Sequence, residues 1–168
     1  MAGERIYDEK KAVQLVADEL EQLKDRIIGN MRSAGEVASG RTIRSLRVIS
    51  DDAGAALISA QDMPFGVLET GRRGGKVPYM FSNIIYQWMQ AKGVHGTIRG
   101  NGTQEKADRS MAYAISRNIA QHGSSLCRRG GRSDIYSNEI PRTVSVVVHK
   151  RAAAIDIDNM IPLNNIGD

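Results

Sequence analysis

The chain has 168 residues, of which 41% are hydrophobic and 25% are charged, and its net charge is +4. This length fits one domain with a core of its own. The sequence has no run of 18 apolar residues, which argues against a membrane span, and its first residues lack the apolar segment of a secretion signal. A single cysteine, Cys127, excludes an internal disulfide and fits a reducing compartment.

The charge is distributed unevenly along the chain. Residues 1–31 hold five basic and seven acidic residues, a net charge of −2. Residues 71–132 hold eleven basic and two acidic residues, a net charge of +9. A chain polarised in this way can attract phosphate, or it can attract the acidic face of another copy of itself.

The first predicted element is a long amphipathic helix over residues 9–31. Its apolar residues recur at intervals of three and four and form one narrow stripe: Val13, Val16, Leu20, Leu23, Ile27 and Met31. We expect this stripe to cover the protein's own sheet, with packing on another subunit as the alternative. A second, short helix is predicted over residues 36–45.

Two strands over residues 44–50 and 55–60 are predicted around the turn sequence Asp51-Asp52-Ala53-Gly54. A lone hairpin is only marginally stable in water, so it must pack on a helix or extend into a larger sheet, to which a neighbouring chain could contribute strands. The predicted fold class is therefore α+β: a long N-terminal helix and further helices packed on a small antiparallel β-sheet or hairpin.

Two helices are predicted in the middle of the chain. The first is short, with Asp62 as its cap and Gly71 at its end, and the second begins at Ser82 and ends at Gly93. The second helix carries the only tryptophan, Trp88, whose neighbours at helical spacing are aliphatic. We therefore predict Trp88 to be a core or interface anchor rather than a platform for a cofactor.

Two more helices are predicted in the second half. One runs from the N-cap residue Thr103 to Gly123, and the other has Pro141 in its first turn and reaches about Ile157. The valines of this last segment favour a strand by propensity, but its alanine-rich continuation favours the helix that we predict. We expect one domain over residues 1–168, with an extended or flexible tail from about residue 158.

Two loops rich in glycine and arginine, 71–76 and 127–134, repeat one chemistry. Their cations cannot form a core and must face water, an anion or another chain: Arg72, Arg73, Lys76, Arg128, Arg129 and Arg132. We expect the loops to lie near each other and to bind carboxylates of a neighbouring subunit or to line a DNA channel. Glu69 is the predicted partner of such arginines, and Phe65 and Trp88 are the predicted apolar anchors.

Sequence patterns of common catalytic and cofactor sites are missing. The chain has no GxxxxGK[ST], no GxGxxG after a strand, no CxxC and no HExxH. The three histidines, at positions 95, 122 and 149, are scattered, and the carboxylates of the first helix have surface spacing. We therefore expect no enzymatic activity, no cofactor and no metal.

Five segments in a fixed order carry a resemblance to a known family: 65–72 (FGVLETGR), 75–78 (GKVP), 84–93, 112–123 (AYAISRNIAQHG) and 129–138 (RGGRSDIYSN). In these segments the chain resembles the head–tail joining or tail-completion (neck) proteins of tailed bacteriophages. The resemblance covers about residues 64–140, and the N-terminal helix and hairpin come in the order usual for such proteins.

The resemblance implies a structural virion protein that forms a ring in the phage neck and joins the portal or connector to the tail around the DNA channel. It implies assembly in the host cytoplasm and, as partners, further copies in a homo-oligomeric ring, other neck, portal or tail proteins, and non-specifically the packaged DNA. An acidic first helix and a basic middle would supply the two unlike patches that a ring needs.

The residues also allow an alternative, a basic nucleic-acid-binding accessory module. The segment with a charge of +9 could meet phosphates through salt-dependent counterion release. Against this alternative, the aromatic residues do not interleave with the basic ones as a stacking platform for single strands requires.

Overall fold

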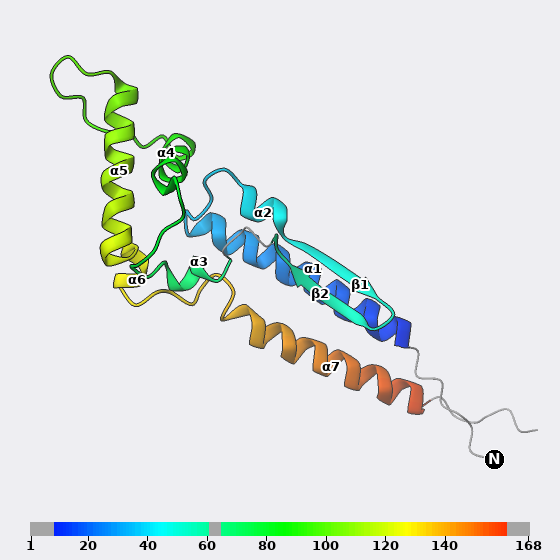
Figure 1. Cartoon of the computed structure of the whole chain (residues 1–168). Helices are drawn as coiled ribbons and strands as arrows, with labels where there is room; N and C mark the ends of the chain where they lie inside the picture. Colours follow the sequence, from blue (N-terminus) through cyan, green and yellow to red (C-terminus); the bar gives the residue numbers. More distant parts are fainter. Residues whose placement is uncertain (1–8, 61–64, 161–168) are drawn as a thin grey trace, which may run out of the picture.

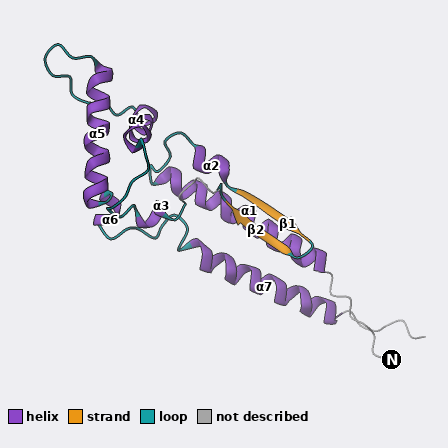
Figure 2. Ribbon diagram, viewed as in Figure 1, coloured by secondary structure: helices purple, strands orange, loops and turns teal. Residues whose placement is uncertain are grey.

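A computed structural model describes residues 9–60 and 65–160 of the chain. The elements follow in the order α1 (Glu9–Ser33), α2 (Arg41–Ser45), β1 (Arg47–Asp51), β2 (Gly54–Ile58), α3 (Val67–Thr70), α4 (Phe81–Lys92), α5 (Gln104–His122), α6 (Ser125–Arg128) and α7 (Glu139–Met160). The fold is α+β, as predicted, with a long N-terminal helix and one small antiparallel sheet (Figure 2).

The hairpin lies along α1, as Figure 1 shows. Its strands pair antiparallel, with Arg47 opposite Ile58 and Asp51 opposite Gly54. The apolar stripe of α1 meets the inner face of this hairpin, and the buried residues of this first core are Leu23, Ile27, Met31, Leu46 and Ile135. The prediction that the stripe covers the protein's own sheet is confirmed.

Helix α7 packs beside α1, and polar side chains link the two helices. Arg26 of α1 donates hydrogen bonds to Glu139 at 2.9 Å and to the Thr143 hydroxyl at 2.7 Å, and Lys150 of α7 is paired with the buried carboxylate of Glu19. These contacts hold α7 against α1 from the first turn of α7 to Lys150.

Helices α4 and α5 form a second core away from the hairpin. Ile85 and Met89 of α4 pack against Ala112 of α5, and half-buried residues of both helices surround them. Helix α5 begins at the predicted cap, where the Thr103 hydroxyl accepts a hydrogen bond from the Lys106 N–H at 3.3 Å.

The molecule therefore has two limbs that meet at an angle near α3 and α6 (Figure 1). We call residues 71–132 the α4–α5 limb, and residues 9–60 with 133–160 the α1–α7 limb. The α4–α5 limb has a net charge of +9, and the α1–α7 limb has eleven basic and twelve acidic residues, a net charge of −1. Among the described helices, none has the length and apolar character needed to cross a membrane.

Several predicted boundaries are wrong. Helix α2 begins at Arg41, because residues 36–40 are not helical and end with Gly40 at a φ of 73°. Helix α4 is capped by Met80 at a φ of 60°, so Ser82 already lies inside the first turn. Helix α7 continues to Met160, past the predicted start of the tail at 158, whereas Asp62 and residues 161–168 lie outside the described residues.

Candidate functional site

The carboxylate of Glu69 lies where the limbs meet and is used inside the chain. Its Oε1 accepts hydrogen bonds from the backbone N–H groups of Ile135, Tyr136 and Ser137 at 2.9, 2.7 and 3.0 Å, and its Oε2 accepts one from the Ser137 hydroxyl. Burial raises the pKa of Glu69, but these hydrogen bonds together outweigh burial and hold the pKa below its usual value. Glu69 therefore stays ionised and ties α3 to the start of α7.

The pairing of Glu69 with an arginine of a neighbouring subunit stays a prediction; within the described residues its carboxylate is bonded to donors other than arginine. Its backbone C=O accepts a hydrogen bond from the Arg132 N–H at 2.8 Å, but within the described ranges no guanidinium is bonded to its carboxylate. Three consecutive N–H groups that point into one concave turn satisfy a carboxylate without a second charge. The sequence spacing of 66 residues between Glu69 and Ile135 gives no sign of this backbone arrangement.

Phe65 also belongs to the chain's own fold. Its ring lies 5.0 Å from the ring of Tyr136, and the Tyr136 hydroxyl donates a hydrogen bond to the Gly66 carbonyl at 3.1 Å. Phe65 packs against the first core, so the structure does not present it as the predicted interface anchor. Segments 65–72 and 129–138, which carry much of the family resemblance, are thus two halves of one packed junction.

The two arginine–glycine loops lie against each other, as predicted. Arg72 and Ser124 exchange two hydrogen bonds: the Arg72 N–H donates to the Ser124 hydroxyl at 2.9 Å, and the Ser124 N–H donates to the Arg72 carbonyl at 2.8 Å. A Cβ on Gly71, which has a φ of 67°, would lie 2.4 Å from the Cys127 nitrogen, so only glycine fits at this crossing. Both loops line one open cavity of about 770 Å³.

Arg72 and Arg128 are held by the chain itself. The guanidinium of Arg72 lies over the Phe81 ring at 5.5 Å and donates to the Lys76 carbonyl at 2.7 Å, while its Nε is a buried atom without a hydrogen-bond partner among the described residues. Arg128 donates to the carbonyl of Gly123 at 2.6 Å, at the C-terminal end of α5. Arg128 therefore closes the end of α5, whereas the Arg72 side chain is held between α4 and its own loop.

Arg132 is likewise occupied, and three of the predicted cations remain exposed. Arg132 donates to both carboxylate oxygens of Asp134 at 2.5 and 2.7 Å and to Glu36 at 3.3 Å, which holds the pKa of Asp134 below its usual value. Of the six predicted loop cations, Arg73, Lys76 and Arg129 are exposed and have neither a hydrogen bond nor an ion pair within the described part of the chain.

The outer face of α4 carries an apolar stripe, which we call the α4 stripe: Met80, Ile84 and Trp88, at a spacing of four residues. Trp88 is 42% exposed, because the neighbouring positions Ile85 and Met89 make the contact with α5. Trp88 was predicted to be a core or an interface anchor, and the core role is wrong. The stripe continues past the helix start to Tyr79, which is 92% exposed.

The outer face of α7 carries a second stripe, which we call the α7 stripe: Ile140, Val144 and Val148, again four residues apart. Val148 is 58% exposed. Valine is stiff in a helix and lowers its intrinsic stability, so a valine-rich helix depends on packing. Helix α7 has that packing on its α1 side, whereas this stripe lies open within the described structure.

Asp108 holds the loop before α5. Its buried carboxylate accepts hydrogen bonds from the Gly96 N–H at 2.7 Å, from Gln104 at 2.8 Å, from Gln90 at 3.0 Å and from His95 Nδ1 at 3.1 Å. The Gly96 hydrogen bond, supported by the three side chains, holds the pKa of Asp108 far below its usual value against the opposing effect of burial. The backbone at Gly96 is thereby fixed to α4 and α5, which supply Gln90 and Asp108.

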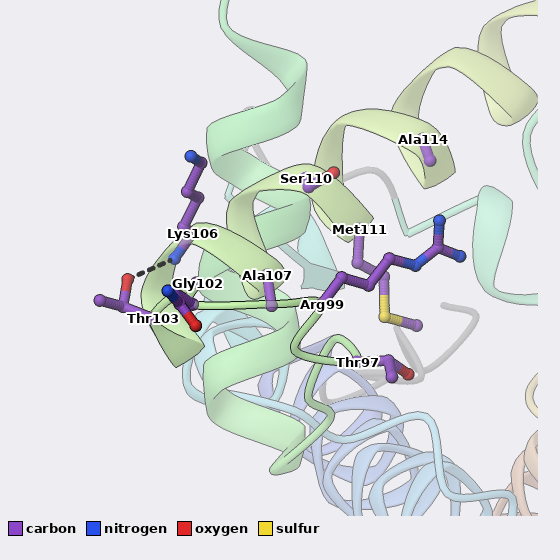
Figure 3. Close-up of a pocket in the computed structure, with 10 residues that line it drawn as sticks. Thr97, Arg99, Gly102, Thr103, Lys106, Ala107, Ser110, Met111 and Ala114 are labelled. Atoms are coloured by element: carbon purple, nitrogen blue, oxygen red, sulfur yellow. Dashed lines mark hydrogen bonds between the residues drawn. The ribbon is translucent and has the colours of Figure 1, made fainter.

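The loop that Asp108 holds faces the first turns of α5 across an open cavity of about 710 Å³ (Figure 3). Its polar lining consists of hydroxyl groups, an amide and two cations: Thr97, Thr103, Ser110, Asn101, Arg99 and Lys106. Among the described residues the side chains of Arg99 and Lys106 make no hydrogen bond or ion pair.

The described residues contain no group of three or more potential metal ligands. Cys127 is a free, half-buried thiol next to the junction, and His95 has the buried Asp108 as its acidic partner.

No family model, no curated protein and no solved structure matches this chain. The resemblance to phage neck proteins consequently depends on the five segments and on what their geometry can do. The sequence reasoning missed Tyr136, Ser137 and Asp108 as structural centres, and it missed the α7 stripe, since the valines were weighed only for propensity. The spacing of four residues between Ile140, Val144 and Val148 was the signal that could have predicted this stripe.

Proposed function

We propose that this chain is a ring-forming structural protein of the neck of a tailed bacteriophage, where it joins the portal side of the head to the tail around the DNA channel. The function is mechanical: copies pack side by side, and the ring contacts other neck, portal or tail proteins. The ordered set of five segments supports the family, and the open surfaces of the two limbs support assembly.

The observation that carries this proposal is a pair of unlike apolar stripes on two different limbs. The α4 stripe includes the large side chains of Met80 and Trp88, whereas every member of the α7 stripe is β-branched. A ring requires heterologous contacts, in which one patch of a copy meets a different patch of the next. Two helices whose side chains recur every four residues can pack ridges into grooves, so the α4 stripe of one copy can pack against the α7 stripe of the next.

Opposite charges on the two limbs would orient one copy relative to the next. The α4–α5 limb has a net charge of +9, and the outer face of α1 carries exposed carboxylates on one stripe: Asp18, Glu21 and Asp25. Exposed ion pairs contribute only about 0–1 kcal/mol each, so they orient the copies while the apolar stripes supply most of the binding free energy.

The test is the size of the purified protein, measured by light scattering after gel filtration and by images of negatively stained particles. We expect closed rings of one copy number, at once or after addition of a partner ring. Exchange of Ile84 and Trp88 for Ser should shift the protein to monomers, because a buried interface tryptophan commonly contributes about 2 kcal/mol or more.

The matched control is Tyr113→Ser, which removes an exposed aromatic side chain from the outer face of α5. This variant should assemble like the unmodified chain. The proposal is wrong if the protein stays monomeric at high concentration and with head or tail particles, or if the control variant disrupts assembly as strongly as the α4 variant.

A further inference from the structure

A surface that neither the ring nor the packing of the limbs uses lies on the outer face of α5. We call it the α5 face, and its exposed residues follow one another at intervals of three and four: Lys106, Ser110, Tyr113, Arg117 and Gln121. The opposite face of α5 carries Ala112, Ile115 and Ile119 and packs on α4. The α5 face therefore points to solvent along the whole helix.

The α5 face contains cations and hydrogen-bond donors but no carboxylate. The two acidic residues of the limb are engaged elsewhere: Glu105 is paired with Arg109 at 2.9 Å, and Asp108 is buried under its four donors. Lys106 and Arg117 have no hydrogen bond or ion pair through their side chains in the described part of the chain. Their charge is not neutralised by the fold.

The free cations continue at both ends of the same helix. Arg99, in the loop that forms one wall of the cavity in Figure 3, lies beside the N-terminal half of α5 and shares this cavity with Ser110 and Met111. At the C-terminal end, the Gly75 N–H donates to the Ala120 carbonyl at 2.7 Å, which brings the free cations Arg73 and Lys76 to α5. The 19 residues of α5 span about 28 Å, close to one turn of duplex DNA.

We propose that the α5 face, extended by Arg99, binds the phosphate backbone of double-stranded DNA without sequence preference. Duplex DNA presents about one negative charge per 1.7 Å, so a basic face of this length can meet several phosphates at once. Hydroxyl and amide donors, here from Ser110, Tyr113 and Gln121, commonly contact phosphate oxygens beside lysine and arginine.

An acidic protein surface fits the α5 face less well. Protein interfaces are centred on apolar side chains from which water is excluded, and in this limb such side chains gather on the α4 stripe instead. The inference goes beyond assembly, and it is tested on the protein in whatever oligomeric state it adopts.

The test is the anisotropy of a labelled duplex of random sequence, titrated with the full chain at several salt concentrations. Contacts to three phosphates, from Arg99, Lys106 and Arg117, give a slope of log K against log salt of about −2.7. The double variant Lys106→Ser, Arg117→Ser should bind on the order of tenfold more weakly at low salt, and its slope should be smaller by about 2.

Two further variants make the result decisive. Arg44→Ser with Arg142→Ser removes the same charge from exposed, unpaired positions of the α1–α7 limb and should leave the slope unchanged. Lys106→Arg with Arg117→Lys keeps the charge and should keep the binding. Circular dichroism confirms folding, and light scattering on the same samples separates a loss of DNA binding from a loss of ring formation.

The inference is overturned if the control pair weakens binding as much as the α5 pair, because net charge alone would then account for the affinity. It is also overturned if polyglutamate displaces the protein from the duplex at a lower charge concentration than unlabelled duplex does, since the face would then fit an acidic protein surface.

Discussion

The junction around Glu69 and the outer faces of α4 and α7 use their side chains in opposite ways. At the junction a carboxylate that is only 3% exposed meets four donors, and the neighbouring glycines touch backbone from the other loop. On the outer faces, large apolar side chains lie open within the described structure. The first region is complete within one chain, whereas the second is the surface that we propose to be covered by another copy.

This difference separates residues that make the fold from residues that make contacts. Substitutions at the junction should change the free energy of unfolding, and any effect on assembly should follow from it. Substitutions on the α4 and α7 stripes should change assembly and leave the free energy of unfolding nearly the same. The predictions below test this separation, from the largest expected effect on stability to the smallest.

Glu69→Ala should lower the free energy of unfolding by about 3–5 kcal/mol, because it leaves three backbone N–H groups and the Ser137 hydroxyl without their acceptor in a buried turn. Urea unfolding followed by circular dichroism measures the loss. Glu105→Ala is the control: it breaks an exposed ion pair with Arg109 and should cost about 0.5 kcal/mol or less. Equal losses in both variants would contradict the assigned role of Glu69.

Gly71→Ala should cost about 2–3 kcal/mol, since the new Cβ would lie 2.4 Å from the Cys127 nitrogen at a φ of 67°. Gly66→Ala, five residues earlier, meets no atom within 4 Å and has a φ of −58°, so it should be nearly neutral. The two unfolding midpoints in urea provide the comparison. A neutral Gly71→Ala would mean that the two loops can separate without loss of stability.

Acid should weaken the junction through Glu69. Its pKa is below the ordinary value of 4.5, so its ionised form stabilises the fold at pH values above 4.5, and this contribution is lost as the pH falls through the lower pKa of the folded state. Asp108 acts in the same direction below its ordinary value of 3.8. Urea midpoints measured from pH 7 downward should therefore fall steeply in acid, and less steeply in Glu69→Gln. Parallel curves for both proteins would speak against this linkage.

The elements of this fold were largely readable from the sequence because periodicity and cap chemistry are local. The stripe of α1, the hairpin turn at Asp51 and the cap at Thr103 all act within a few residues. The role of Glu69 was not readable, since its partners are backbone groups 66 to 68 residues away and backbone donors have no sequence signature.

The candidate site was predictable only in part for a related reason. Composition showed that the two loops carry cations, but not which cations the fold would use. Arg132 lies beside Asp134 and is bound by it, whereas Arg129 remains exposed. Helical spacing alone could have pointed to the α5 face and the α7 stripe, yet a residue's exposure depends on which side its neighbours cover, and that is a property of the tertiary structure.

The smallest effect on stability, and the sharpest test of the comparison, is expected on the α7 stripe. Val144→Ser with Val148→Ser should change the free energy of unfolding of the monomer by about 0.5 kcal/mol or less, because both side chains are more than half exposed. The same pair should weaken assembly by at least about tenfold in concentration, as loss of buried apolar contacts does at an interface. Arg142→Ser, an exposed position on the other flank of α7, should alter neither quantity. If the valine pair destabilises the monomer by as much as Gly71→Ala does, the stripe is part of the fold, and the ring must form through another surface.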